Sequence, residues 1–507
     1  MDHQQENLIP VNRRLDETLF CHDLPTSPLP ELGKILVTGA SGYIGGRLVP
    51  ELIARGYEVR VMVRGDAEVY ADRWPEAEVV EADALDKESL GRTLAGVNTA
   101  YYLIHSLLLG PRDFEAADIE AAANFREVAG KQGLQRIIYL GGLGDSRTSQ
   151  SRHLQCRMQV ADELAAGAVP VTILRAAVII GSGSASYEII HYLAKKMPVL
   201  LVPHWARNAC QPVAVRDVVK YLVGVLETPE TSGRSFDIGG RDVLTYEGML
   251  KTFAGIINRK IAFIRAPFSN ITFYSYMASL LTPVPARITA CLMEGLKDEV
   301  VCANQDIRDL IPFEPLSYRE AIVRALSREE QDIVYTRWSD AYPPAHELAM
   351  KLHELDGEPT YTASHSLLSD KTADAIFKSV CKVGGQTGWF DNNWMWRARG
   401  MVDRIFFGVG SARGRKSHSH LEINDVIDFW RVENIRENRR LLLRAEMLLP
   451  GRAWLEFNIN DENRRRRLSV NAYFHTRTVF GKAYWYAFLP FHRFIFTDLI
   501  EQIEKRS

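Results

Sequence analysis

From Lys34 onward, short apolar runs alternate with longer segments in which apolar residues recur every three or four positions. The short runs predict strands at Lys34–Thr38, Glu58–Arg64, Thr99–Ile104, Arg136–Leu140 and Val171–Leu174. The longer segments predict helices at Tyr43–Ala54, Lys87–Leu94, Glu115–Lys131 and Gln155–Ala166. Strands made almost entirely of Val, Ile, Leu and Tyr are typical of a parallel sheet covered on both faces. Because parallel strands are joined by right-handed crossovers, the pattern predicts a doubly wound α/β sheet.

Three further stretches divide the chain. Residues 1–33 are polar and lack an apolar run, so we interpret them as a flexible leader. From about 182 to 327, loops and helices surround the strand Ser235–Ile238, and we expect a lid and substrate region that completes a first domain spanning 34–327. The charged stretch 328–357 contains Pro343-Pro344 and predicts a linker.

The segment 358–507 has a different pattern. Helical periodicity at Thr372–Val383 and Trp394–Phe407 precedes four alternating runs that predict antiparallel strands. The four runs are Asp425–Asn434, Arg440–Leu448, Ala453–Ile459 and Leu468–Thr476. The aromatic-rich segment Ala483–Lys505 predicts a long final helix. We therefore expect a separate α+β domain at the C-terminus.

Charge and composition exclude several classes of protein. Lys and Arg total 61 against 63 for Asp and Glu, which argues against a nucleic-acid partner, since that needs a basic surface. Six cysteines without a Cys-x-x-Cys pair suggest neither a metal site nor disulfides, and favour a reduced, cytoplasmic protein. The most apolar stretch, Phe268–Pro285, is broken by polar residues and prolines, so we expect no integral membrane segment. The run Arg464–Arg467 is interpreted as a solvated hairpin turn, although peripheral contact with an anionic membrane stays open.

A glycine-rich turn joins the first predicted strand to the first helix. It reads Gly39-Ala-Ser41-Gly42-Tyr43-Ile44-Gly45. At such a turn Gly39 allows a tight bend, Gly42 lets the backbone approach a pyrophosphate, and Gly45 lets the helix pack on the strand. The N-terminus of the helix then points free N–H groups at the anion. The motif predicts a Rossmann-type dinucleotide site, the alternative being a turn without a ligand.

The ends of the following strands suggest which dinucleotide binds. Arg64 ends the second strand, where an arginine accommodates the 2′-phosphate of NADP, while Asp66 leaves NAD(H) possible. Asp83 follows the third strand and could bind the adenine amino group, or it could cap a helix. Further cofactor contacts are expected from Ala84, Ile104 and His105. We therefore expect NADP(H) as the preferred cofactor.

Taken together, these motifs resemble the short-chain dehydrogenase/reductase superfamily, in its extended, atypical NmrA-like branch. The resemblance runs from Lys34 to about Leu326 and rests on four pieces of sequence. They are Thr38–Gly45, Val171–Arg175, Gln211–Val218 and Phe236–Gly240. The resemblance implies a Rossmann fold and a nicotinamide cofactor.

The sequence differs from the family at the positions of the family's catalytic residues. The family places a Tyr-x-x-x-Lys pair on the helix after the fourth strand, where this chain has His153 and Arg157, as in a bacterial YbjT-like subgroup. It also places a serine at the end of the fifth strand, where Gly141 and Gly142 stand and leave room for substrate or for donation by backbone N–H groups. His153 and Arg157 share one helix face, so His153 can exchange a proton while Arg157 holds ribose hydroxyls or an oxyanion. The alternative is that both are structural or only bind cofactor.

Family analogy also suggests substrate contacts. Ile180 and Gly181 would lie beside the nicotinamide carboxamide, and Trp205 and Gln211 in the substrate pocket. An ordinary packing contact within the lid is the alternative for Trp205.

The last domain resembles the domain of unknown function that follows the reductase domain in the same subgroup, and its element order is similar to the helix-grip, START-like arrangement. Trp430, Trp454, Trp485 and Phe491 could line an apolar cavity for a ligand, or could be ordinary core.

The sequence thus predicts an NADP(H)-dependent oxidoreductase that acts on a small, apolar carbonyl or alcohol substrate. The alternative is a non-catalytic NAD(P)-binding regulator that uses its second domain for a ligand or partner.

Overall fold

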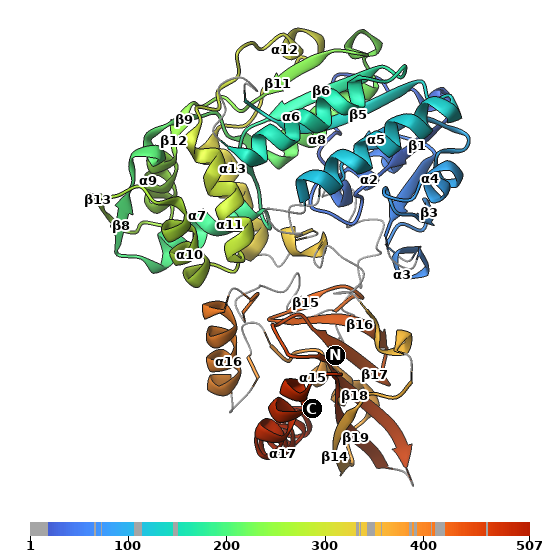
Figure 1. Ribbon diagram of the computed structural model, residues 1–507, viewed down its shortest axis with the longest axis vertical. Helices are drawn as coiled ribbons and strands as arrows, with labels where there is room; N and C mark the ends of the chain where they lie inside the picture. The colour runs from blue at the N-terminus through green and yellow to red at the C-terminus, as the bar shows by residue number, and fades with distance from the viewer. Residues whose placement is uncertain are drawn as a thin grey trace, which may run out of the picture.

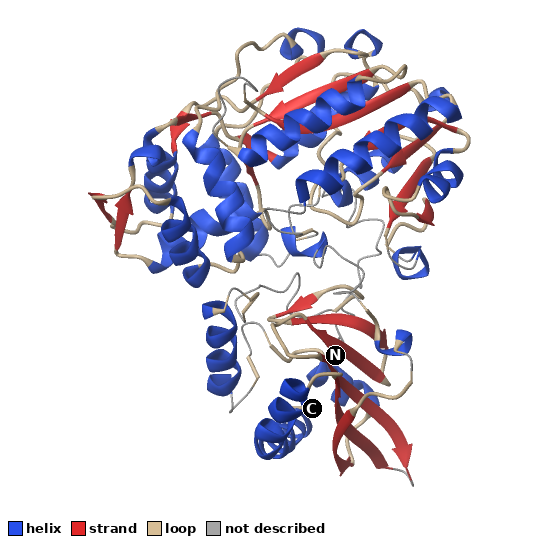
Figure 2. Cartoon of the chain, in the orientation of Figure 1, coloured by secondary structure: helices blue, strands red, loops and turns tan. Residues whose placement is uncertain are grey.

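The computed structural model folds into two lobes, each built on one large sheet (Figures 1 and 2). The structure describes residues 19–64, 67–71, 73–105, 114–144, 151–330, 334, 336–341, 350–355, 357–384, 388–389, 393–406, 408–410, 421–462 and 465–507. No helix within these ranges is both long enough and apolar enough to cross a membrane.

The first sheet has seven parallel strands in the order β11-β6-β5-β4-β1-β2-β3. Their bounds are Lys34–Val37 (β1), Val59–Val63 (β2), Glu78–Glu81 (β3), Val97–Tyr102 (β4), Arg136–Gly142 (β5), Val171–Ala176 (β6) and Ser235–Ile238 (β11). The chain winds from β1 to β3 in one direction and from β4 to β11 in the other. This confirms the doubly wound prediction, and it moves Ser235–Ile238 from the expected lid into the main sheet, where it pairs with β6.

Helices cover both faces of this sheet. Their bounds are Gly45–Ala54 (α2), Lys87–Leu94 (α4), Phe114–Gln132 (α5), Arg152–Ala165 (α6) and Val215–Leu226 (α8). Neighbouring residues of a strand point to opposite faces. Ile35 accordingly packs in one core with residues of α2 and α8, and Leu36 in another with residues of α4, α5 and α6.

Residues 19–33 of the expected leader belong to the folded first lobe. Phe20, Cys21 and Leu24 are buried in the first core, and the backbone N–H of Cys21 donates to the Glu51 carboxylate of α2 at 3.1 Å. The prediction of a flexible leader is therefore wrong for residues 19–33, because a buried carboxylate and apolar surface hold them. Residues 1–18 lie outside the described part of the chain.

Beside the main sheet stands the lid region. Its helices are Ala185–Lys196 (α7), Tyr246–Ile256 (α9), Ile271–Leu281 (α10), Ala286–Glu294 (α11) and Tyr318–Glu330 (α13). Three two-stranded sheets accompany them: Ile179–Ile180 (β7) with Val213–Ala214 (β10), Ala209–Cys210 (β9) with Leu244–Thr245 (β12), and Val199–Val202 (β8) with Ala262–Arg265 (β13).

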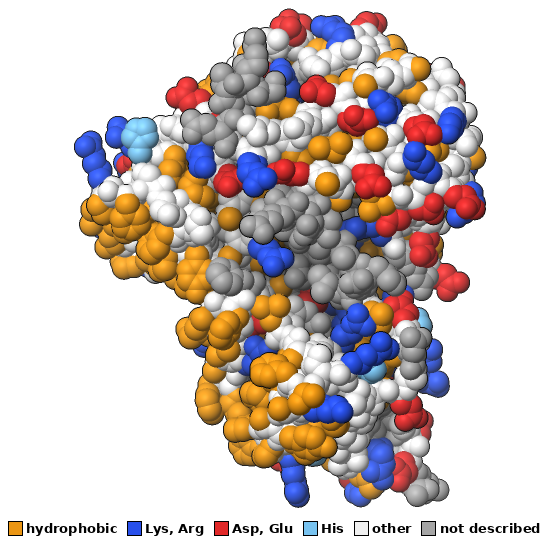
Figure 3. All heavy atoms as spheres, viewed as in Figure 1, with side chains coloured by type: hydrophobic (Ala, Val, Ile, Leu, Met, Phe, Trp, Pro, Cys, Tyr) orange, Lys and Arg blue, Asp and Glu red, His pale blue; other side chains and the backbone are white. Residues whose placement is uncertain are grey.

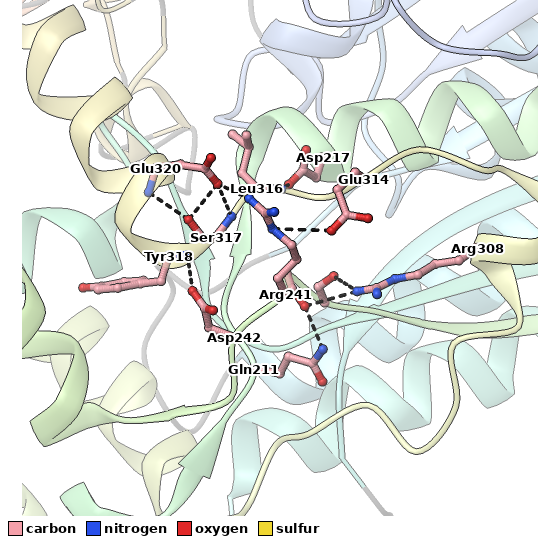
Figure 4. Close-up of polar contacts among 12 residues, drawn as sticks. Gln211, Asp217, Arg241, Asp242, Arg308, Glu314, Leu316, Ser317, Tyr318 and Glu320 are labelled. Atoms are coloured by element: carbon pink, nitrogen blue, oxygen red, sulfur yellow. Dashed lines mark hydrogen bonds and ion pairs between the residues drawn. The ribbon is translucent and has the colours of Figure 1, made fainter.

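Two of the resemblance motifs meet at the base of the lid region (Figure 4). Gln211 donates to the Gly240 carbonyl at 2.8 Å, and the Asp217 carboxylate accepts the Leu316 N–H at 2.8 Å. Ser317 and Glu320 bond reciprocally at the start of α13, as in a capping box. These motifs therefore anchor the lid region to the end of β11.

The second sheet has six antiparallel strands in the order β14-β19-β18-β17-β16-β15. Its lobe consists of Tyr361–Ser369 (β14), Ala373–Val380 (α15), Asn393–Ile405 (α16), Val426–Ile427 (β15), Trp430–Arg436 (β16), Arg440–Ala445 (β17), Arg452–Glu462 (β18), Arg465–His475 (β19) and Val479–Lys505 (α17). The separate α+β lobe is confirmed. The sequence missed β14, whose polar and small residues give little apolar signal, and fused β15 with β16 across a turn at Asp428, where φ is 55°.

The four aromatic residues expected around one cavity do not share one surface. Trp430 pairs with Ala445 and Trp454 with Arg444, so the two indoles point to opposite faces of the sheet. Trp485 stacks on Phe474 on the helix-covered face, whereas Phe491 is 49% exposed. The prediction that these four side chains line a common cavity is wrong, because strand register separates two of them and the helix turns a third toward solvent.

Candidate functional site

The glycine turn lies at the carboxyl end of β1, between the ends of β2 and β4. This is the point where the strand order reverses, the usual ligand site of an open α/β sheet. Gly39 has a φ of 63°, and a Cβ atom there would come within 2.6 Å of the Leu103 carbonyl oxygen. A Cβ atom at Gly45 would lie 2.5 Å from the Gly39 carbonyl oxygen. Both positions therefore require glycine.

The start of α2 suits an anion. The helix begins at Gly45, and no side chain caps it at Ile44. The N–H groups of Gly46 and Arg47 already donate to the Gly42 and Ile44 carbonyls at 3.0 Å, so a phosphate would be met by the N–H groups of the turn just before them. Ser41, Gly42 and Tyr43 form the partly buried turn before it. A Cβ atom at Gly42 would lie only 3.1 Å from the Gly39 carbonyl oxygen, which keeps the turn tight. The backbone thus fits a dinucleotide pyrophosphate.

The residues that the sequence assigns to cofactor selection follow β2 and β3, at the carboxyl edge of the first sheet. Arg64 follows β2 directly and is exposed, while Asp66 lies outside the described residues. Asp83 is exposed and accepts the Leu85 N–H at 2.9 Å. The alternative role of Asp83 as a helix cap is wrong, because Asp86 caps α4 by accepting the N–H groups of Glu88 and Ser89. Ala84 is buried behind this loop.

A histidine pair lies at the carboxyl end of β4. His105 contacts the Asp118 carboxylate of α5 through Nδ1 at 3.0 Å, and its ring centroid is 5.1 Å from that of His153 on α6. Nε2 of His105 and Nδ1 of His153 are buried and have no hydrogen-bond partner among the described residues. Burial is the main cause that lowers the pKa of both rings, and Arg157 lowers the pKa of each further. Both imidazoles are therefore neutral at pH 7.

Arg157 holds the ends of two strands. Its guanidinium donates to the carbonyl of Ile104 at 3.4 Å and to that of Leu140, and it lies 4.8 Å from the centre of the Tyr139 ring. Arg157 is thus a cation that is already bonded to backbone near the carboxyl ends of β4 and β5.

The two glycines at the end of β5 leave less room than the sequence suggested. A Cβ atom at Gly142 would meet the Leu154 side chain of α6 at 2.8 Å, so helix packing fills that space. A Cβ atom at Gly141 would lie 3.0 Å from the Tyr139 ring.

The residues expected around the substrate separate into two groups. Ile180 and Gly181 follow β6 and lie near the glycine turn, since a Cβ atom at Gly181 would meet the Tyr43 hydroxyl at 2.7 Å. Trp205 is buried in the lid region and donates to the Ser269 carbonyl at 3.2 Å. Gln211 gives its amide N–H to Gly240 and accepts the Cys302 N–H at 3.1 Å. These bonds account for the burial of Trp205 and Gln211 without a substrate.

Sequence reasoning missed Asp118. It stands near the start of a helical pattern, thirteen positions after His105, with no motif around it. Only the crossover from β4 to α5 brings the two side chains together. The linker was also misjudged: Thr336 is fully buried, donates to the Tyr43 carbonyl at 2.9 Å and accepts from Arg47 at 3.2 Å.

Comparison with known proteins agrees with this architecture. The model described as NmrA-like family matches residues 31–305, and the model described as Protein of unknown function (DUF2867) matches residues 357–499. A mitochondrial NADH dehydrogenase (ubiquinone) 1 alpha subcomplex subunit 9 from Arabidopsis thaliana is 28% identical over 46% of this chain and 60% of its own length. The ceramide reductase of Caulobacter vibrioides is 27% identical over 47% of this chain and 75% of its own.

Among solved structures, the Citrobacter sp. triphenylmethane reductase complexed with NADP(H) has a TM-score of 0.48 and 19% identity, covering 58% of this chain and 99% of that one. The chain spans 60% of the length of the Arabidopsis protein. Because one family model matches more than half of its residues, the chain belongs to the NmrA-like family, with the region of unknown function DUF2867 at its C-terminus.

Proposed function

We propose that this protein is an NADP(H)-dependent oxidoreductase that interconverts a carbonyl compound and its alcohol. One observation carries the proposal. The neutral pair His105 and His153 stands at the same sheet edge as the glycine turn, with buried ring nitrogens that lack partners among the described residues. Buried polar atoms without partners are uncommon and mark functional sites.

The chemistry follows from the state of His153. A bound nicotinamide would supply the hydride for reduction of the carbonyl carbon, or receive it when the alcohol is oxidised. His153 takes the hydroxyl proton during oxidation and returns it during reduction. Because its pKa is lowered from 6.5, mainly by burial and then by His105, His153 is present as the base at neutral pH. Asp118 orients His105, and His105 in turn supports the ring of His153.

Preference for NADP(H) is assigned to Arg64. The proposal is supported by the place of Arg64, which is exposed directly after β2, the strand end where an arginine accommodates the 2′-phosphate of NADP. Arg64→Glu should shift the NADPH-to-NADH affinity ratio toward NADH by about a hundredfold, of the order expected for losing a charged bond and adding repulsion. Arg92→Glu, an exposed arginine on α4, is the matched control and should leave the ratio unchanged. An unchanged ratio in Arg64→Glu would remove this role.

The substrate is proposed to be apolar. The proposal is supported by one relative, 27% identical over 47% of this chain, that is named ceramide reductase. An apolar ligand of the second lobe belongs to the same proposal, and native mass spectrometry of the purified protein checks it. The six cysteines are all unpaired, in keeping with the cytoplasmic location that we propose.

The deciding experiment is a calorimetric titration of NADP⁺ and NADPH, separately, into the wild type, His153→Ala and the exposed control His22→Ala. We expect all three proteins to bind both forms, and turnover of a carbonyl panel to fall at least about a hundredfold only in His153→Ala. A fully active His153→Ala variant would overturn the catalytic assignment. A wild type that binds neither form would overturn the function as a whole.

The second candidate is a non-catalytic regulator that senses the redox state of the cofactor. The bonds of Arg157 to the Ile104 and Leu140 carbonyls favour it, since they give this cation a structural role. The same titration separates the two candidates. Binding of one cofactor form by a wide margin, without turnover, supports the regulator.

A further inference from the structure

The exposed aromatic side chains gather on one side of the molecule. Across the described ranges, every exposed Phe, Trp and Tyr lies in or beside three helices: α10, α16 and α17. On α17, Phe480 is 75% exposed and Phe494 60%. On α16, Trp394 is 67% exposed, and Phe406 directly after it is 66% exposed. We call these side chains, with Phe273 of α10, the aromatic face.

The aromatic face is continuous across the two lobes. Tyr276 of α10 donates to the Ile405 carbonyl at the end of α16 at 3.3 Å, and Arg404 of α16 donates to the Ser279 carbonyl of α10 and to that of Val284 at 3.3 Å. Apolar side chains cover α10, α16 and α17 on the viewed side (Figure 3). Exposed apolar side chains that gather in one patch mark interaction surfaces of folded proteins.

The charges on the α17 side of the aromatic face are of one sign. From residue 463 to residue 497 the sequence contains no Asp or Glu. Arg477, Lys482 and Arg493 are exposed there and form no ion pair among the described residues. Arg397 on α16 is a further exposed cation, whereas Arg399 on the same helix lies 3.8 Å from the Asp403 carboxylate. Helices that lie in the headgroup layer of a bilayer have this composition, with aromatic side chains beside unpaired cations.

We propose that the aromatic face docks this protein on the surface of an anionic phospholipid bilayer. The aromatic rings enter the boundary between headgroups and acyl chains, and the cations contact lipid phosphates. A second copy of the chain fits less well, because a symmetric contact through α17 would bring Arg477, Lys482 and Arg493 against the same cations. The proposal concerns location and is independent of the reaction.

The test is co-sedimentation of the full chain with phosphatidylcholine vesicles and with vesicles in which about a third of the lipid is phosphatidylglycerol. We expect strong binding to the anionic vesicles only. Phe480→Ser/Phe494→Ser and Lys482→Glu/Arg493→Glu should each lower the partition coefficient at least about tenfold. Lys482→Arg should bind as the wild type does.

The matched control is Val243→Ser/Val323→Ser, which changes two exposed apolar residues outside the aromatic face. It should bind like the wild type. Unchanged NADPH binding and thermal unfolding verify that every variant is folded. The proposal is overturned if the wild type does not bind, if it binds neutral vesicles equally well, or if light scattering shows a lipid-free dimer that Phe480→Ser/Phe494→Ser dissociates.

Discussion

The carboxyl edge of the first sheet and the aromatic face break the usual burial rule in opposite ways: the first buries polar atoms, and the second exposes apolar rings. At the edge, His105 and His153 bury ring nitrogens that no described residue bonds. At the aromatic face, Phe480 and Trp394 leave apolar rings in contact with water. A buried unpaired polar group costs about 1–3 kcal/mol, and an exposed Phe forgoes about 2 kcal/mol of burial. Each region therefore gives up stability, and a different kind of partner would restore it.

The largest expected effect is a difference in unfolding free energy between substitutions in the two halves of α17. Phe496 is 4% exposed and packs in the core of the second lobe, so Phe496→Ala should lower the free energy of unfolding by about 3–5 kcal/mol. Phe480→Ala, in the same helix, should change it by less than about 0.5 kcal/mol. Urea unfolding followed by tryptophan fluorescence measures both. Equal losses would mean that Phe480 is part of the core and that the aromatic face is ordinary packing.

Next in size is a substitution at the glycine turn. Gly39→Val introduces a branched side chain at a φ of 63° and a clash with the Leu103 carbonyl, so we expect a loss of about 2 kcal/mol of stability and loss of NADPH binding. Gly130→Ala in α5 is the control, because its Cβ atom would meet nothing within 4 Å. It should leave binding intact and stabilise the helix slightly. Retained binding in Gly39→Val would contradict the assigned site.

The Asp217 carboxylate is buried like the histidine pair, but it has a hydrogen-bond partner, so it serves as a reference for the effect of burial alone. Asp217 accepts the Leu316 N–H, yet burial raises its pKa from 3.8 to about 6. A carboxyl whose folded pKa exceeds its unfolded value stabilises the fold below the unfolded value, and this contribution is lost as pH rises through the folded one. The wild type should therefore lose of the order of 2 kcal/mol relative to Asp217→Asn between about pH 4 and pH 6. Parallel stability curves for the two proteins would disprove the shift.

The smallest effect tests the histidine pair itself. His153→Phe replaces a ring with an unpaired buried nitrogen by an apolar one, so we expect a gain of about 1 kcal/mol in stability with loss of turnover. His105→Phe should instead destabilise the protein, because it removes the Asp118 bond. Thermal unfolding compares the two. A loss of stability in both would mean that His153 has a partner in the fold.

Local patterns were enough for the elements of the first lobe. Strands buried on both faces are continuous apolar runs, and the glycine turn sits between a strand and a helix, so residues 34–54 alone predicted β1, the turn and α2. The second lobe was harder. β14 alternates half-buried and exposed residues and pairs with β19, about a hundred positions later, and no local signal predicts such a pairing.

The sequence by itself determined the doubly wound sheet, the dinucleotide turn and the separate C-terminal lobe, because periodicity and glycine spacing are local properties of the chain. Only the tertiary structure decided that Asp118 stands behind His105, that Arg157 joins two strand ends, and that three helices combine their exposed rings into one face. These are contacts between residues far apart in sequence or on crossing elements. Their geometry depends on how helices pack on a twisted sheet, and no spacing of residues along the chain records it.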